Sequence, residues 1–148
     1  MSKANDLLKA ATKAAKKANK KNKFNARKVE YDGHKFDSQA EYERYVSLRD
    51  DQKDGKIIRL EVHPKFELVV NGVLIRTYTA DFKYTIVRNG AAIRRVVEDV
   101  KSPPTAKLDT FRMVKKLMLA IYGIEVKVVL KKDVTIPSGI GKDGMVLR

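Results

Sequence analysis

The stretch from Ile57 to Lys101 places the strongest limit on the fold, because its hydrophobic residues recur with the period of two that is typical of β-strands. Two Asn-Gly dipeptides, at 71–72 and 89–90, interrupt this pattern, and such a dipeptide favours the tight turn of a β-hairpin. The sequence therefore predicts a group of hairpin-connected strands, over residues 57–62, 66–70, 73–78, 79–87 and 93–101, with 73–78 running on into 79–87.

A helix is predicted before these strands, from about Ser38 to Lys53. Glu41 stands three residues after Ser38, as the acid of a capping box does, and it shares one helix face with Tyr45 and Leu48. The pattern leaves two roles open for Glu41, a helix cap or an acid that points toward the body of the protein.

A second amphipathic helix is predicted after the strands, from Ala106 to Tyr122, with Gly123 as its stop signal. The Val-rich segment 125–130 follows as a last strand, which we expect to be internal to the sheet. A chain of 148 residues with these elements makes one domain, which we expect to span residues 29–132.

The net charge of +14 indicates a partner rich in phosphate. Residues 1–28 hold ten Lys or Arg against one acid, so +9 of this charge lies in a basic N-terminal tail that is disordered alone or helical on a partner. A tail that only keeps the protein in solution is the alternative. Residues 133–148 are expected to form a C-terminal tail.

The chain has no cysteine and no hydrophobic run near the roughly 20 residues of a membrane span. Disulfides and thiolate metal sites are therefore excluded. We expect a protein of the reducing cytoplasm that does not bind membranes.

Three charged residues on neighbouring predicted strands suggest a metal site. Asp99 and Lys101 lie two residues apart and share a strand face, whereas Glu98 points to the other side. Pairing across the 89–90 turn would bring Asp81 close to Asp99, and two adjacent carboxylates favour Mg²⁺ or Mn²⁺ between them. Lys101 could then orient or deprotonate an attacking water. An ordinary cross-strand ion pair is the alternative.

The order of these motifs resembles the PD-(D/E)xK nuclease superfamily, and within it small phage resolvase-like endonucleases similar to phage endonuclease I. The segments that carry the resemblance are Phe36-x-Ser38-x-x-Glu41, Tyr78-Thr79-Ala80-Asp81-Phe82 and Val97-Glu98-Asp99-Val100-Lys101-Ser102. Ala80 stands where the family name has Pro, and the similarity extends over roughly residues 29–130.

The resemblance implies an α/β (α+β) fold with a restriction-endonuclease-like core, a mixed sheet of four or five strands flanked by helices in the order α-β-β-β-α-β. It implies that Glu41, Asp81 and Asp99 hold Mg²⁺ or Mn²⁺ and that Lys101 completes the catalytic set. It also implies a homodimer that cleaves duplex or branched DNA, in the manner of a Holliday-junction resolvase, inside a phage-infected bacterial cell.

Eight basic residues are expected to contact the DNA backbone: Lys107, Arg112, Lys115 and Lys116 of the second helix, and Lys16, Lys17, Lys20 and Lys21 of the tail. A solvated charged face is the alternative for the helix residues. His63 precedes a proline and could lie near the site, but a surface position is the more common one for such a histidine. Two other functions stay open, a non-catalytic DNA-binding or architectural protein and a nuclease subunit of a recombination complex.

Overall fold

The structure, a computed structural model, describes residues 28–134. The predicted basic tail, with Lys16, Lys17, Lys20 and Lys21, and most of the predicted C-terminal tail lie outside the described residues. The described part belongs to two units. In the first, β1 (Val29–Tyr31) pairs with β2 (His34–Phe36) as an antiparallel hairpin.

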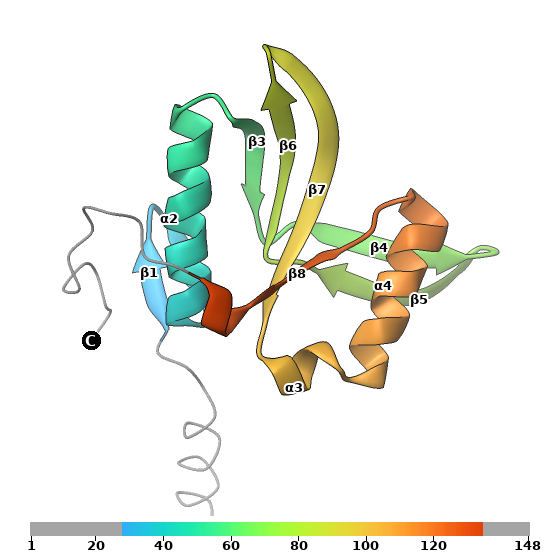
Figure 1. Cartoon of the computed structure of the whole chain (residues 1–148). Coiled ribbons are helices and arrows are strands. Elements are labelled where there is room, and N and C mark those ends of the chain that lie inside the picture. Colours follow the sequence, from blue (N-terminus) through green and yellow to red (C-terminus); the bar gives the residue numbers. More distant parts are fainter. Residues whose placement is uncertain (1–27, 135–148) are drawn as a thin grey trace, which may run out of the picture. The chain divides into compact units, whose positions relative to one another are not determined.

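The second unit, residues 40–144, is built on a four-stranded mixed sheet (Figure 1). Its strands are β3 (Ile57–Val62), β6 (Phe82–Arg88), β7 (Ala91–Lys101) and β8 (Lys127–Leu130), in that spatial order. β3, β6 and β7 are antiparallel to their neighbours, and β8 runs parallel to β7. The predicted α/β (α+β) class, with a mixed sheet flanked by helices, is confirmed.

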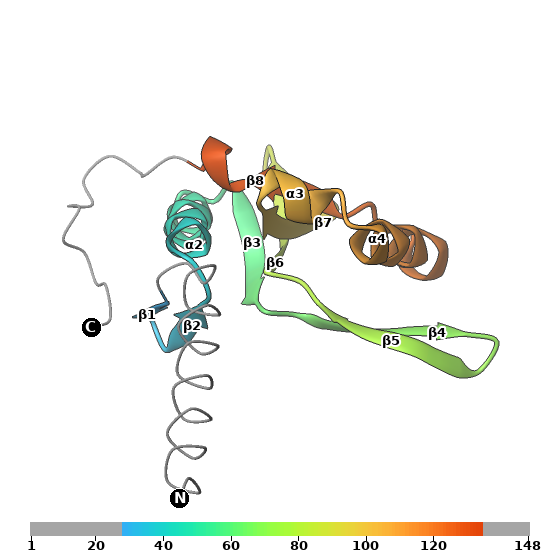
Figure 2. The same ribbon diagram turned by 90° about the horizontal axis from the view of Figure 1, so that it is seen from below.

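Helices cover both faces of this sheet (Figure 2). α2 (Gln39–Lys53) lies on one face, where the ring of its Tyr45 packs 6.5 Å from that of Phe82. α4 (Asp109–Tyr122) lies on the other, where Phe111 and Met118 join a buried cluster with Val97. Strand alternation explains the division, because Val97, Asp99 and Lys101 of β7 point to the α4 side and Glu98 points to the α2 side.

A separate hairpin interrupts the order of the core elements. β4 (Lys65–Val70) and β5 (Val73–Thr79) pair only with each other, around the predicted Asn71-Gly72 turn. Without this hairpin, the elements α2, β3, β6, β7, α4 and β8 follow the order α-β-β-β-α-β.

The prediction that residues 73–78 run on as one strand into 79–87 is wrong. β5 ends at Thr79 and β6 begins at Phe82, so Asp81 lies in the connection and not within a strand. The chain must leave the β4–β5 sheet here and enter the central sheet. Ala80, fully buried, makes this crossing with its N–H bonded to the carbonyl oxygen of Pro64 at 3.0 Å.

The segment after β7 differs from its prediction as well. Instead of one helix from Ala106, the chain forms α3 (Pro103–Ala106), breaks at Leu108, whose backbone is extended, and then forms α4. Residues 103–104 are prolines, which start a helix well because their φ angle is already helical.

The last strand is shorter than predicted, 127–130. It lies at the edge of the described sheet and is not internal, since β7 is its one partner among residues 28–134. A short 3₁₀ turn, η1 (Lys131–Asp133), follows. None of the helices in the described part of the chain has both the length and the apolarity to cross a membrane.

Candidate metal-binding and catalytic site

Asp81 is held at the end of the central sheet by three hydrogen bonds that involve the main chain. Its carbonyl oxygen accepts the N–H of His63 at 2.9 Å, and its own N–H donates to the carbonyl oxygen of Glu98 at 3.1 Å. Its side-chain Oδ2 accepts the N–H of Val100 at 2.6 Å. The carboxylate therefore has a fixed position beside β7, where Asp99 lies next to Val100.

Asp99 is buried and is bonded through both of its oxygens. The Tyr78 hydroxyl donates to Oδ2 at 2.6 Å, and the Lys101 ammonium lies 3.2 Å from Oδ1. Burial, with the negative charge of Asp99, raises the pKa of Tyr78, so this hydroxyl stays protonated and remains a donor. The predicted proximity of Asp81, Asp99 and Lys101 thus appears in the structure, with Tyr78 as a further member.

Glu41 reaches the same place from the first turn of α2. It is buried, 7% exposed, and its Oε2 lies 3.7 Å from Nε2 of His63. Glu41, His63 and Asp81 each offer one ligand atom, and these three atoms lie within 4.8 Å of one another. Glu41 therefore points inward, and His63 belongs to this cluster, which is the less favoured of the two positions that its sequence allowed.

The predicted metal set and the structural cluster overlap in part. Glu41 and Asp81 belong to both, whereas His63 takes the third place in the cluster and Asp99 is bonded to Tyr78 and Lys101. Carboxylates suit Mg²⁺ and Mn²⁺, and an imidazole nitrogen beside them shifts the preference toward transition metals. Mn²⁺ fits this donor set at least as well as Mg²⁺.

The electrostatics of the site favour a cation. Burial, then the charge of Asp99 and then that of Glu41, raises the pKa of Asp81 to about 9. Burial and these two charges therefore favour the protonated form of Asp81 while no cation is present. A divalent cation would favour the ionised form of this carboxyl group, which is a common reason for acids to gather in a half-buried site.

Asp81→Asn is expected to stabilise the metal-free protein by about 1–2 kcal/mol above pH 7, because the amide keeps the bond from Val100 and carries no charge. A carboxyl group with a raised folded-state pKa binds a proton on folding, so its contribution to stability falls as pH rises from the usual range of an Asp toward about 9.

Urea unfolding in EDTA at pH 5 and pH 8.5 measures the effect, and Asp109→Asn, at a side chain that is 98% exposed, is the matched control. If the stability of Asp81→Asn falls from pH 5 to pH 8.5 as much as that of the unmodified protein, the raised pKa of Asp81 is not the cause of the fall.

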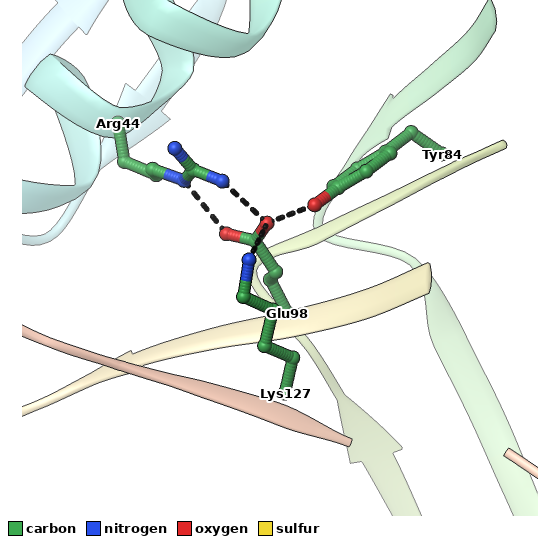
Figure 3. A network of polar contacts seen from close by, with 4 residues as sticks. All are labelled: Arg44, Tyr84, Glu98 and Lys127. Atoms are coloured by element: carbon green, nitrogen blue, oxygen red, sulfur yellow. Dashed lines mark hydrogen bonds and ion pairs between the residues drawn. The ribbon is translucent and has the colours of Figure 1, made fainter. Parts of the chain in front are cut away.

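A second polar network lies on the opposite side of β7, around Glu98 (Figure 3). Arg44 of α2 donates to both carboxylate oxygens of Glu98, at 2.8 and 2.7 Å, and the Tyr84 hydroxyl donates to one of them. The Lys127 ammonium lies 3.9 Å away. Glu98 is fully buried, and its charge raises the pKa of Arg44, so the two groups form a buried ion pair.

This network ties together the elements that carry the site. Arg44 follows Glu41 by three residues on α2, and Glu98 precedes Asp99 on β7. The pair therefore fixes α2 against β7 within one turn of Glu41. Glu98, the alternative acid of the motif, faces away from Asp99, as strand alternation predicts.

Three of the four basic residues predicted for the second helix lie in α4, and Lys107 lies between α3 and α4. Lys107, Arg112 and Lys116 are exposed, and Arg112 lies 3.8 Å from Asp109. The Lys115 ammonium is 5.5 Å from the centre of the Phe111 ring, which the Lys101 ammonium approaches to 4.9 Å. Lys115 is thus the member of this group that the structure brings next to the site.

Comparison with known proteins identifies a family. A family described as "Protein of unknown function (DUF1064)" matches residues 21–132, well over half of the chain, so the chain belongs to this family. No curated protein and no solved structure matches the chain. The function must therefore be argued from the site itself.

Proposed function

We propose that this member of the DUF1064 family is a metal-dependent DNA endonuclease of the PD-(D/E)xK type that hydrolyses phosphodiester bonds in duplex or branched DNA. The observation that carries the proposal is the gathering of Glu41, Asp81, Asp99 and Lys101 at one end of the sheet. The order α-β-β-β-α-β of the core elements adds support, because it is the order that the resemblance implies.

A role can be proposed for each residue of the candidate site. Glu41 and Asp81, with Asp99 or His63, would hold Mg²⁺ or Mn²⁺, and such an ion supplies positive charge to the scissile phosphate. Lys101, fixed by Asp99 and by the Phe111 ring, would hold its ammonium group toward the phosphate and the attacking water. Tyr78 positions Asp99 by its hydroxyl.

The proposed partner is DNA, and the proposed assembly is a homodimer in the cytoplasm of a phage-infected bacterial cell. The excess of basic residues favours DNA as the partner. Self-association is supported by the tip of the β4–β5 hairpin, where Val73, Leu74 and Ile75 are 60%, 54% and 51% exposed.

A cleavage assay tests the proposal. Supercoiled plasmid and a synthetic four-way junction are incubated with the protein in Mg²⁺, in Mn²⁺ and in EDTA. We expect nicked or linear products with either metal ion and none in EDTA. Absence of products from both substrates, with DNA binding retained, would reject the nuclease proposal.

That result would favour the second candidate function, a non-catalytic DNA-binding protein. One observation supports this alternative: both oxygens of Asp99 already have partners in Tyr78 and Lys101, so this acid is satisfied without a metal ion.

A further inference from the structure

A cleft of about 390 Å³ lies between β5 and the α3–α4 segment. Figure 2 shows the setting, with α4 beside the β4–β5 hairpin. Residues from four elements line the cleft, among them Arg76 and Thr79 of β5, Lys101 of β7, Thr105 of α3, and Thr110 and Phe111 of α4. The hairpin that interrupts the core order therefore supplies one wall of this cleft.

The cleft is continuous with the candidate site. Tyr78 and Lys101 both line it, and both contact the carboxylate of Asp99, at 2.6 and 3.2 Å. A molecule that occupies the cleft is thus held against Lys101. Phe111, whose ring lies 4.9 Å from the Lys101 ammonium, lines the cleft as well.

The chemistry of the lining suits a phosphate backbone. Its charged members are Arg76 and Lys101, and none of its residues is acidic. Threonine hydroxyls supply neutral donors, and Arg76 and Thr110 are exposed at the walls. Among the residues that the structure describes, none forms an ion pair with Arg76. Arg, Lys and Thr are side chains that commonly bind phosphate oxygens.

We propose that this cleft binds the sugar–phosphate backbone of one strand of the DNA substrate and leads it to Lys101. This inference rests on the proposed function and names the path by which its substrate reaches the site. The cleft, at about 390 Å³, lies at the lower end of the ~300–1,000 Å³ that ligand clefts span, which suits a short segment of one strand's backbone. DNA opened near a branch presents such a strand.

Cysteine footprinting tests the position of the strand without any need for cleavage. The chain has no cysteine of its own, so Thr110→Cys in one cleft wall is the only thiol of that variant. Ala92→Cys, exposed near the opposite end of β7, is the matched control. Each variant is alkylated with a maleimide in EDTA, alone and with a four-way junction at ten times its Kd.

The junction is expected to slow alkylation of Thr110→Cys about tenfold, because only about one protein in eleven is then free of DNA. Alkylation of Ala92→Cys is expected to stay unchanged. Equal rates with and without the bound junction at Thr110→Cys would overturn the cleft proposal, even for a protein that cleaves DNA.

A charge variant gives an independent readout. Arg76→Ala is expected to weaken junction binding and to lower the slope of log Kd against log salt by about 1, as the loss of one phosphate contact does. Arg94→Ala removes the same charge at the far end of β7 and is expected to leave binding unchanged. Equal effects of the two substitutions would also overturn the proposal.

The two proposals fail in distinguishable ways. If the protein cleaves DNA but the junction does not protect Thr110→Cys, the nuclease proposal stands and the cleft proposal is rejected. If the junction protects Thr110→Cys but is not cleaved in Mg²⁺ or Mn²⁺, the cleft proposal stands and the nuclease proposal is rejected. A protein that neither binds nor cleaves the junction overturns both.

Discussion

Lys101→Met is expected to cleave DNA at least about 100-fold more slowly than the unmodified protein, since removal of one group that stabilises transition-state charge typically costs 10²–10³ in rate. The methionine keeps an apolar stem against Phe111, so the fold is expected to stay intact. The measurement is a single-turnover cleavage time course in Mn²⁺ on the four-way junction.

Two further variants make this result specific to the site. Asp81→Asn is expected to lose cleavage to a similar or larger degree, although it folds more stably without metal. Lys83→Met removes a lysine that pairs with the exposed Glu61 on β3, and is expected to cleave normally. A Lys101→Met protein that cleaves at the rate of Lys83→Met would exclude Lys101 from the reaction.

The parts of the site that could be predicted from sequence are those set by local geometry. The Asn89-Gly90 turn sets the antiparallel pairing of β6 with β7, although the register in which Phe82 faces Glu98 also depends on a shift between Ile86 and Val87 that the sequence does not show. Strand alternation then places Asp99 and Lys101 on one side and Glu98 on the other. Both follow from the two-residue period of a strand, which requires no knowledge of the rest of the fold.

The parts that could not be predicted depend on contacts between distant segments. His63 enters the site because its main-chain N–H donates to the carbonyl oxygen of Asp81, and the local pattern before Pro64, which allowed this position, favoured the surface instead. The Tyr78 hydroxyl donates to Asp99 from β5, which lies in a sheet separate from that of β7, and strand periodicity alone does not indicate this contact. The separation of β5 from β6 was missed for the same reason: an extended pattern does not say which strand is the partner.

The buried ion pair was the largest omission. Arg44 and Glu98 are separated by 54 residues, and an arginine in the middle of a charged helix is normally a surface residue. The one available signal was Glu98 itself. Glu98 shares its strand face with Val96 and Val100, and an acid on an apolar face requires a partner if that face is buried.

The same pair gives the largest expected effect on stability. Arg44→Met is expected to lower the free energy of unfolding by about 3–5 kcal/mol, because the fully buried carboxylate of Glu98 loses its bidentate partner. Urea unfolding at pH 7 measures the loss. Lys83→Met again serves as the control, since it breaks an exposed pair and is expected to cost at most about 1 kcal/mol.

Removing both charges of the ion pair distinguishes its effect on the stability of the fold from its effect on the position of Glu41. The double variant Arg44→Met/Glu98→Leu leaves no buried charge unpaired, and replacement of both partners by apolar groups is often neutral or stabilising. We therefore expect it to regain most of the stability that Arg44→Met loses. Its cleavage rate is expected to stay low, because the ion pair between α2 and β7 is gone and Glu41 loses that support for its position relative to Asp81. A double variant that regains stability and cleaves at the unmodified rate would show that packing alone positions Glu41.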